Sequence, residues 1–310
     1  MRRWLALPFV LLAANAAEQT PPPLSVAEPA VTTLAEQLAF GHSEPRMTVP
    51  VEIAGAGPYQ FIIDTGAQRT VISRELAGKL GLAGGRNVRL TGMTGTDTVR
   101  TVVIPSISVS TLTGARIEAP ALAAVHLGAP GMLGIDALQG HALAIDFDRQ
   151  QMTVTPALRR GRVRRPAADE IVIQARSLFG QLVVTDARVA GHKVRVILDT
   201  GSVVSMGNSA LRRKLTRGKV QPVTLIGVTG GQITADYGAV RTIKIGGVEI
   251  NDMPIAFADV APFRAFGLEK KPAILLGMDA LKLFARVDID FANRELRLAL
   301  PRNTRRRMAT

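Results

Sequence analysis

Two short stretches of the chain place an aspartate directly after an apolar run. Residues 61–66 read FIIDTG and residues 196–201 read VILDTG, so Asp64 and Asp199 are each followed by threonine and glycine. Apolar neighbours make it costly to ionise a carboxylate. An Asp–Thr–Gly turn after a strand is also an ordinary structural feature, so a single copy would not indicate chemistry.

Two copies allow chemistry that one copy does not. If the two turns meet at a pseudo-two-fold axis, the carboxylates of Asp64 and Asp199 face each other. Because like charges that close cannot both ionise cheaply, the pair would share one proton. The ionised carboxylate could then take a proton from an attacking water while the protonated one donates to a carbonyl oxygen. Such a pair needs neither a metal nor a covalent intermediate.

The residues that follow each aspartate suit this arrangement. Gly66 and Gly201 have no side chain, so the backbone can pass close to the carboxylates. Thr65 and Thr200 can form hydrogen bonds across the axis and fix the two turns relative to each other. These four residues are therefore predicted to support the pair of acids.

The similarity between the two halves extends well beyond these triplets. At an offset of 135 residues, an apolar i,i+4 pair, its N-capping residue and a glycine-rich segment all recur. Further along, MLGIDAL at 132–138 corresponds to LLGMDAL at 275–281 with an offset of 143. The second half therefore carries eight extra residues, which we place within 261–273 and interpret as a surface loop, with a segment that lines one end of the cleft as the alternative.

The repeat and the composition predict an all-β fold of two homologous lobes, each with short helices, in a pseudo-two-fold arrangement. Apolar residues make up 47% of the chain, aromatics only 4%, and 29 glycines and 18 prolines interrupt the apolar runs, as is typical of short strands and turns. The predicted domains are an N-terminal lobe at 30–155, a basic linker at 156–168, a C-terminal lobe at 169–300 and a basic tail at 301–310.

The first residues are typical of an export signal. Arg2 and Arg3 precede a short apolar run, and the small residues at 14–16 fit a cleavage site, so we expect removal near Ala16. A proline-rich spacer would follow at 17–29. This predicts a periplasmic or secreted protein, with an uncleaved, membrane-associated start as the alternative. The absence of cysteine excludes disulfides and thiolate chemistry, and it suits a bacterial envelope.

The chain is strongly basic, with a formal net charge of +13. Such a charge favours anionic partners, and the linker PALRRGRVRRPAA carries five arginines. We interpret this linker as a solvated connection, with binding to an anionic envelope surface as the alternative. No aromatic residues are interleaved with the arginines, so the stacking platforms of specific nucleic-acid binding are missing.

The stretches IIDTGA and ILDTGS, each with a later apolar–apolar–glycine segment (MLG and LLG), resemble the aspartic peptidases of the retropepsin and pepsin type. The resemblance covers nearly all of both halves. It implies that Asp64 and Asp199 form a catalytic dyad that needs no cofactor. It also implies that the segments 91–97 and 226–232 are flaps over an extended peptide, contributed by Gly92, Thr94, Gly95, Gly227, Thr229 and Gly230. Neither flap has the tyrosine of pepsin-like enzymes.

The sequence therefore predicts an aspartic endopeptidase with one site between two lobes, acting on extended polypeptide segments as a monomer. Three alternatives stay open. The fold could bind peptides in the envelope without cleaving them, the protein could act through its basic linker, or a swapped dimer could form the pair of acids.

Other polar residues are predicted to be structural. Asp136 and Asp279 each stand at the start of a predicted helix and fit capping or bracing roles. Asp146 and Asp290 precede turns. Ser202 has no evident histidine partner that would make it a nucleophile, so we expect it to hydrogen-bond the carboxylate of Asp199 instead. No metal-ligand spacing is formed by the four histidines, His42, His126, His141 and His192.

Overall fold

The computed structural model describes residues 4–5, 11–13, 47–109, 112–114, 116–157, 165–167, 169–178, 180–215 and 218–301. Apart from two short strands, the predicted signal peptide lies outside these residues, as does the proline-rich spacer. Most of the basic linker and nearly all of the basic tail also lie outside them. These four assignments therefore stay predictions.

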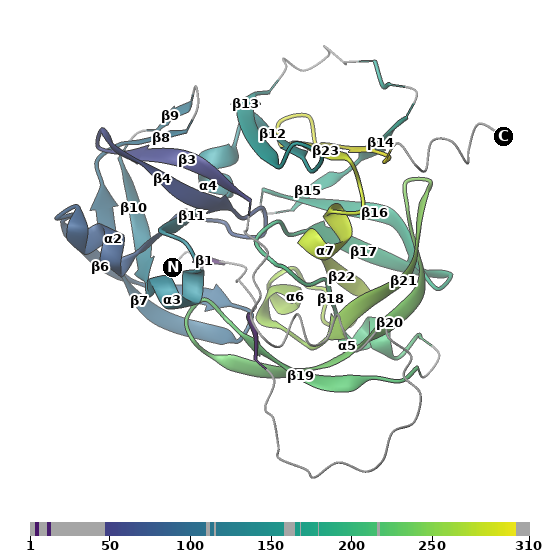
Figure 1. Ribbon diagram of the computed structural model, residues 1–310. Coiled ribbons are helices and arrows are strands. Elements are labelled where there is room, and N and C mark those ends of the chain that lie inside the picture. Colours follow the sequence, from purple (N-terminus) through teal and green to yellow (C-terminus); the bar gives the residue numbers. More distant parts are fainter. Residues whose placement is uncertain are drawn as a thin grey trace, which may run out of the picture.

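Strands dominate both lobes, and each lobe adds a few short helices (Figure 1). The N-terminal lobe contains β3 (Thr48–Ile53), β4 (Ala56–Ile63), β5 (Val71–Ser73), α2 (Arg74–Lys79), β6 (Gly84–Gly92), β7 (Gly95–Ile104), β8 (Ile107–Val109), β9 (Leu112–Gly114), β10 (Ile117–Leu122), α3 (Ala124–Leu127), β11 (Gly131–Leu133), α4 (Ile135–Leu138), β12 (His141–Asp146) and β13 (Gln151–Pro156).

The C-terminal lobe contains β14 (Glu170–Gln174), β15 (Arg176–Leu178), β16 (Gln181–Val189), β17 (His192–Leu198), β18 (Met206–Gly207), α5 (Ser209–Arg212), β19 (Gln221–Ile226), β20 (Gln232–Ile245), β21 (Val248–Phe257), α6 (Ala261–Ala265), β22 (Ala273–Leu276), α7 (Met278–Leu281), β23 (Arg286–Asp290) and β24 (Glu295–Ala299). Two further strands come from the start of the chain, β1 (Trp4–Leu5) and β2 (Leu11–Ala13).

The two lobes repeat one strand order. From its outer edge, the first sheet runs β1-β6-β7-β10-β5-β11-β4-β3, and the second runs β2-β19-β20-β21-β18-β22-β17-β16. From β6 in the first order and β19 in the second, strands at the same place in the two orders come from equivalent segments of the sequence repeat. The predicted all-β fold of two homologous lobes is therefore confirmed.

Local sequence explains how the short helices begin. Ser73 precedes α2, and its Oγ accepts a hydrogen bond from the amide of Leu76 at 3.1 Å. Asn208 holds the equivalent place before α5, and its Oδ1 accepts from the amide of Leu211 at 2.9 Å. Both side chains satisfy a helix amide that would otherwise lack a partner.

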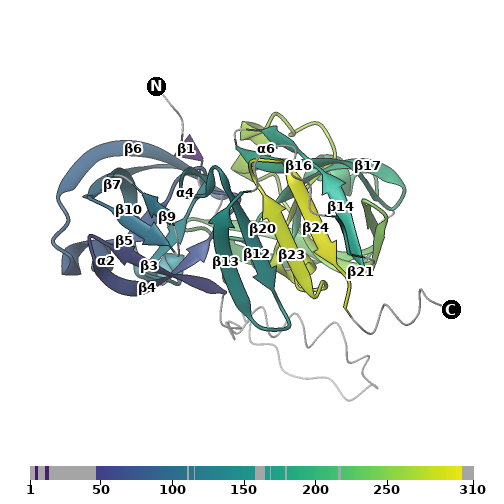
Figure 2. The same ribbon diagram turned by 90° about the horizontal axis from the view of Figure 1, so that it is seen from above.

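A third sheet joins the lobes. Its order is β13-β12-β23-β24-β14, so two strands of the N-terminal lobe pair with three of the C-terminal lobe (Figure 2). At its centre, Ala144 of β12 pairs with Asp288 of β23, and these two residues are equivalent in the repeat. The pseudo-two-fold axis therefore passes through this pair. The neighbouring side chains of Leu143 and Ile289 are fully buried in a core that both lobes share.

None of the helices in the described part of the chain has the length and hydropathy needed to span a bilayer.

This shared core predicts that damage at the junction destabilises the whole molecule. We expect Leu143→Ala to lower the free energy of unfolding by about 2–5 kcal/mol, because it leaves a cavity in a close-packed region. Denaturation in guanidinium chloride measures this. The control is Val125→Ala at a side chain that is 73% exposed, which we expect to change stability by no more than about 0.5 kcal/mol. Equal effects of the two substitutions would contradict the shared core.

Candidate active site

Each of the two aspartates stands at the end of a buried strand. Asp64 follows β4 and Asp199 follows β17, and the last three residues of both strands are buried. The amide of Asp64 donates to the carbonyl of Leu133 at 2.9 Å, and the amide of Asp199 donates to that of Leu276 at 3.0 Å. The apolar–apolar–glycine segments found in the sequence therefore hold the backbone of the two acids.

The two Asp–Thr–Gly turns are tied together by their threonines. The amide of Thr65 donates to Oγ1 of Thr200, and the amide of Thr200 donates to Oγ1 of Thr65, both at 3.1 Å. Oγ1 of Thr65 donates to the carbonyl of Leu198 at 2.9 Å, and Oγ1 of Thr200 donates to that of Ile63 at 2.7 Å. Four hydrogen bonds thus cross between the lobes, and each has an equivalent across the axis.

The carboxylates are oriented by backbone amides. Oδ1 of Asp64 accepts from Gly66 and Ala67 at 2.8 and 2.9 Å. Oδ1 of Asp199 accepts from the equivalent two amides, both at 3.1 Å. The other oxygen of each carboxylate, Oδ2, is buried and has no hydrogen-bond partner. These two oxygens are therefore free to interact with each other and with a water molecule.

Close backbone packing keeps the acids in contact. A methyl group added to Gly201 would lie only 2.3 Å from Cγ of Asp64. A larger residue at this position would displace the carboxylate, so the absence of a side chain is required here. The structure thus brings all five predicted supporting residues to the two acids, although their roles in catalysis stay predictions.

Burial and mutual repulsion change the protonation of the pair. Burial raises the pKa of Asp64 well above its ordinary value, and the charge of Asp199 raises it further, against the lowering effect of the two amides. Burial also raises the pKa of Asp199 to about 7, again against two amides that favour ionisation. The pair therefore retains a proton in neutral and mildly acidic solution.

Comparison with known proteins agrees with this geometry. A family model described as aspartyl protease matches residues 49–137 and 185–280, one region in each lobe and together more than half of the chain. The chain belongs to the aspartyl protease family. Among solved structures, a retropepsin-like aspartic protease from Rickettsia conorii matches with 23% identity, over 42% of this chain and 89% of that protein, with a TM-score of 0.30. No curated protein matches the chain.

In this member of the aspartyl protease family, the predicted flaps are two hairpins. We call the β6–β7 hairpin the N-terminal flap and the β19–β20 hairpin the C-terminal flap. Gly95 has a φ of 147°, and the turn of the C-terminal flap closes with a hydrogen bond from the amide of Gly230 to the carbonyl of Gly227 at 2.9 Å. At or beside these tips lie all six predicted flap residues, Gly92, Thr94, Gly95, Gly227, Thr229 and Gly230.

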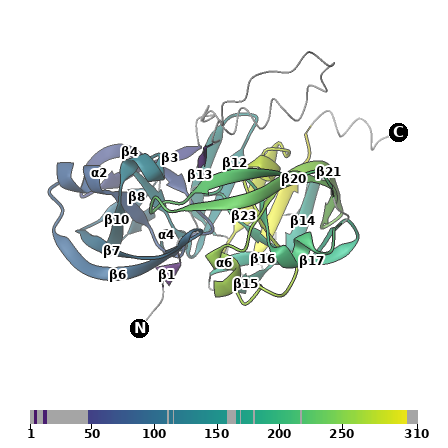
Figure 3. The ribbon, with the colours of Figure 1, turned by 90° about the horizontal axis from the view of Figure 1, so that it is seen from below.

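The flap tips cross to the opposite lobe. Met93 of the N-terminal flap is 2% exposed and packs in a cluster with Phe263 and Val204 of the C-terminal lobe. Val228 of the C-terminal flap is 1% exposed and packs in a cluster with Leu90 and other residues of the N-terminal lobe. Figure 3 shows β20 extending over the N-terminal lobe. The exchange covers the acids, which are completely buried.

Sequence reasoning missed these two tip residues. The signal was present, because Met93 and Val228 occupy equivalent positions in the repeat and are the apolar residues of otherwise polar, glycine-rich turns. An apolar side chain at a hairpin tip is buried only if other apolar side chains pack against it. Here each lobe supplies these side chains for the flap tip of the other lobe.

The interpretation of residues 261–273 as a surface loop was wrong. This segment forms α6, and Phe263, Phe266 and Leu268 are buried in the cluster that receives Met93. The amide of Ala261 also donates to the carbonyl of Met93 at 3.3 Å. Since its aromatic side chains point inward and meet the flap, the insertion belongs to the site.

A third residue that the sequence did not reveal is Gln181, at the start of β16. It is fully buried, and its Nε2 donates to the carbonyl of Gly66, in the turn that carries the first acid. Its Oε1 has no hydrogen-bond partner. This side chain therefore links the C-terminal lobe to the N-terminal Asp–Thr–Gly turn.

The residues that were predicted to be structural have structural contacts. Oδ1 of Asp136 accepts from the amide and hydroxyl of Thr70, both at 2.8 Å, and the carboxylate of Asp279 accepts from those of Ser205 at 2.8 and 2.6 Å. They brace the loops that follow the two turns. Ser202 does hydrogen-bond the carboxylate of Asp199, but through its amide at 3.1 Å, whereas its hydroxyl donates to the carbonyl of Val204 at 2.8 Å.

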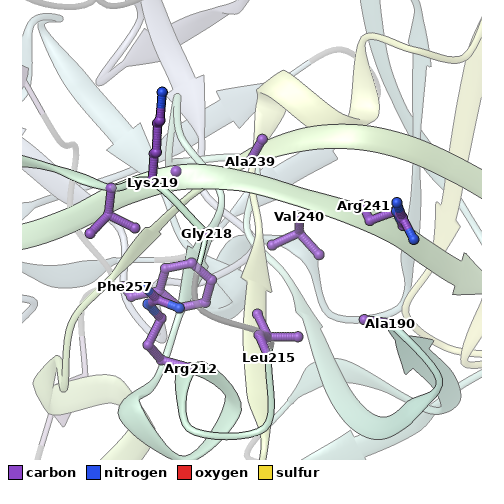
Figure 4. Close-up of a pocket in the computed structure, with 11 residues that line it drawn as sticks. Ala190, Arg212, Leu215, Gly218, Lys219, Ala239, Val240, Arg241 and Phe257 are labelled. Atoms are coloured by element: carbon purple, nitrogen blue, oxygen red, sulfur yellow. The ribbon is translucent and has the colours of Figure 1, made fainter.

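A separate cavity of about 340 Å³ lies on the C-terminal lobe (Figure 4). It is lined by Arg212, Lys219 and Arg241 around apolar residues, and the guanidinium of Arg212 lies 5.5 Å from the centre of the Phe257 ring. Because neither acid nor flap tip lines it, this cavity is not the candidate active site. Within the described ranges, no three histidine, aspartate or glutamate side chains are grouped so that they could hold a metal ion.

The raised pKa values predict that stability falls as the pH rises. The unfolded carboxyl of Asp199 titrates near 3.8, whereas the folded one keeps its proton to about pH 7, so between these values the folded state binds more protons. The resulting contribution to the free energy of unfolding is fully present below about pH 4 and is lost towards pH 7. We expect the thermal unfolding temperature to fall between pH 5 and 7, and Asp199→Asn to flatten the fall. Asp252→Asn, at an exposed strand residue, should leave the fall unchanged.

The crossed flaps predict that a disulfide can fasten them. A Cβ atom at Gly227 would lie 3.5 Å from Cβ of Thr94, at the short end of the disulfide range. We expect Thr94→Cys with Gly227→Cys to cross-link on mild oxidation, which mass spectrometry detects as the loss of two free thiols. The natural chain has no cysteine to interfere. In the control, Thr94→Cys with Lys244→Cys near the far end of β20, both thiols should stay free. The crossed arrangement would be contradicted if Thr94→Cys with Gly227→Cys did not cross-link under these conditions.

Proposed function

We propose that this protein is an aspartic endopeptidase, which hydrolyses peptide bonds in extended polypeptide segments. The observation that carries the proposal is the pair of buried, interacting carboxylates of Asp64 and Asp199, each with one oxygen held by amides and one left free. Aspartic proteases are the standard case of two carboxylates that share one proton.

The geometry supports a mechanism with four proton transfers. A water between the free oxygens loses a proton to the ionised carboxylate as its oxygen attacks the carbonyl carbon of the substrate. The protonated carboxylate meanwhile donates its proton to the carbonyl oxygen. The tetrahedral gem-diol then breaks its carbon–nitrogen bond: a proton passes from the dyad to the leaving nitrogen, and one of the two diol hydroxyls returns its proton to the dyad as the carboxyl group forms. One water is consumed, and a carboxyl group and an amine are released.

The flaps supply access control in this proposal. Because the acids are completely buried beneath the crossed tips, the flaps must open before a polypeptide can enter. After closure they exclude bulk water and strengthen the electrostatic interactions around the reacting carbonyl. The substrate would bind as an added strand, held through its main chain.

One chain supplies both acids, so we propose a monomer as the active form. We further propose that it acts after export, once the leader near Ala16 is removed, and that its basic surface lies against anionic envelope components. The positive start and apolar run of the sequence and its net charge of +13 support these proposals.

The test of the activity uses an unstructured casein as substrate. We expect cleavage by the chain from residue 17 onward, and a loss of about 100-fold or more in rate for Asp64→Asn and for Asp199→Asn. Cleavage should be measurable in neutral and mildly acidic solution, because burial raises the pKa of both carboxyls and the pair keeps a proton there. Oxidised Thr94→Cys/Gly227→Cys should be inactive and should recover with a reductant.

The matched control is Asp252→Asn, which is expected to keep full activity. Cleavage that survives both dyad substitutions would reject the dyad. Binding of casein without any cleavage by the natural chain would favour a peptide-binding protein instead.

A further inference from the structure

The cavity on the C-terminal lobe combines apolar surface with positive charge, and we call it the basic cavity. Its volume of about 340 Å³ lies within the range of roughly 300–1,000 Å³ that small-molecule sites occupy. Three of its described lining residues, Arg212, Lys219 and Arg241, are basic, and all of the others are apolar residues or glycine. This composition suits a ligand that carries negative charge and apolar surface together.

The basic cavity lies at the base of the C-terminal flap, at the end of the hairpin opposite the tip. Its wall includes Lys219 and Val220, directly before β19, and its floor includes residues 238–241 of β20. A Cβ atom at Gly238 would lie 2.8 Å from both the carbonyl oxygen of Lys219 and Cγ1 of Val220. Because Gly238 has no side chain, this wall can approach the strand closely.

The charged and apolar side chains are arranged along the cavity. Figure 4 shows Arg212 and Phe257 together at one side and Arg241 at the other, with Leu215 and Val240 between them. Phe257 and Val240 are buried, and Leu215 packs against the same core, so the apolar floor is a fixed part of the lobe. An apolar chain over this floor would have a guanidinium at its end.

Arg212 is well placed to bind an anionic head group. Its guanidinium lies over the ring of Phe257, at 5.5 Å from the ring centre, and such stacking fixes the planar group while its edge keeps N–H donors. Among the described residues, no carboxylate forms an ion pair with it. A donor group that is already ordered loses less conformational freedom when a ligand binds.

The N-terminal lobe provides an internal comparison. At the repeat offset of 135 residues, Ala77 stands in the place of Arg212 and Gly84 in the place of Lys219. Because the two lobes share one strand order, the fold does not require basic side chains at these places. The positive charge is therefore a particular property of the cavity in the C-terminal lobe.

We propose that the basic cavity binds an anionic amphiphile with one apolar chain. Its carboxylate or phosphate head pairs with Arg212, and its chain lies over Leu215 and Val240. Arg241 and Lys219 add long-range attraction for the negative charge. Binding does not depend on the proposed peptidase activity, because neither acid nor flap tip lines the cavity.

The first experiment titrates the natural chain with decanoate below its micelle concentration, by isothermal titration calorimetry. We expect octanoate to bind about tenfold more weakly, because each buried CH₂ group contributes about fourfold. Decyltrimethylammonium has the same chain with a positive head and should not bind. Inorganic phosphate should not bind at the same concentrations, because it has no chain to bury.

The second experiment compares matched variants in the same titration. We expect Arg212→Gln to weaken decanoate binding by about tenfold or more, since it removes the charged donor. Arg213→Gln removes the same charge at the exposed neighbouring residue, which does not line the cavity, and should stay within about twofold. At Ala239, an exposed lining residue, Ala239→Asp should weaken binding by about tenfold and Ala239→Asn much less.

The source of the amphiphile is tested by sedimentation with phosphatidylglycerol vesicles. Sedimentation that Arg212→Gln reduces and Arg213→Gln does not would identify a membrane lipid as the ligand. Decanoate binding together with sedimentation that is equal in the two variants would identify a free amphiphile, with the vesicles bound by basic residues elsewhere.

Other outcomes would overturn the inference. These are no binding of decanoate to the natural chain, equal binding of decanoate and octanoate, and equal effects of Arg212→Gln and Arg213→Gln on decanoate. Casein cleavage without decanoate binding would overturn the inference and leave the peptidase standing. Decanoate binding without casein cleavage would do the reverse.

Discussion

The structure depends on holding two carboxyl groups together where both side chains are fully buried. Two buried carboxylates repel each other, and each loses its hydration. The reciprocal hydrogen bonds of Thr65 and Thr200 oppose this repulsion by fixing the two turns, and four amides stabilise the inner carboxylate oxygens. The remaining repulsion between the two carboxylates is relieved because they share one proton. The pair of carboxyls can therefore both accept and donate a proton.

The same symmetry governs closure. Each flap buries an apolar tip in the opposite lobe, and burial of a side chain of this size contributes about 1.5–3 kcal/mol. Two such contacts make the closed form stable, yet they remain small beside the interactions that an extended polypeptide can offer. The balance suits a site that must open for each substrate.

Much of this could be predicted from the sequence, because a repeat carries spatial information. Equivalent residues of two homologous lobes lie at equal distances from the axis, so the meeting of Asp64 with Asp199 followed from their spacing. The helix caps followed from local chemistry. The burial of Met93 could not be predicted, since its partners come from the other lobe and leave no periodic pattern. Phe263 was misjudged because a short insertion that contains prolines resembles a loop. That Ser202 binds Asp199 through its amide could not be predicted, because the direction of its hydroxyl depends on the local turn.

The insertion also breaks the symmetry at the flaps. Met93 is held by the cluster around α6 and by the hydrogen bond from Ala261 to its carbonyl. Val228 has apolar contacts in the N-terminal lobe, and among the described residues no backbone hydrogen bond joins its turn to that lobe. The N-terminal flap is therefore the more firmly anchored of the two. The two halves therefore share one fold but hold their flaps unequally, because only the second half carries the insertion that contains α6.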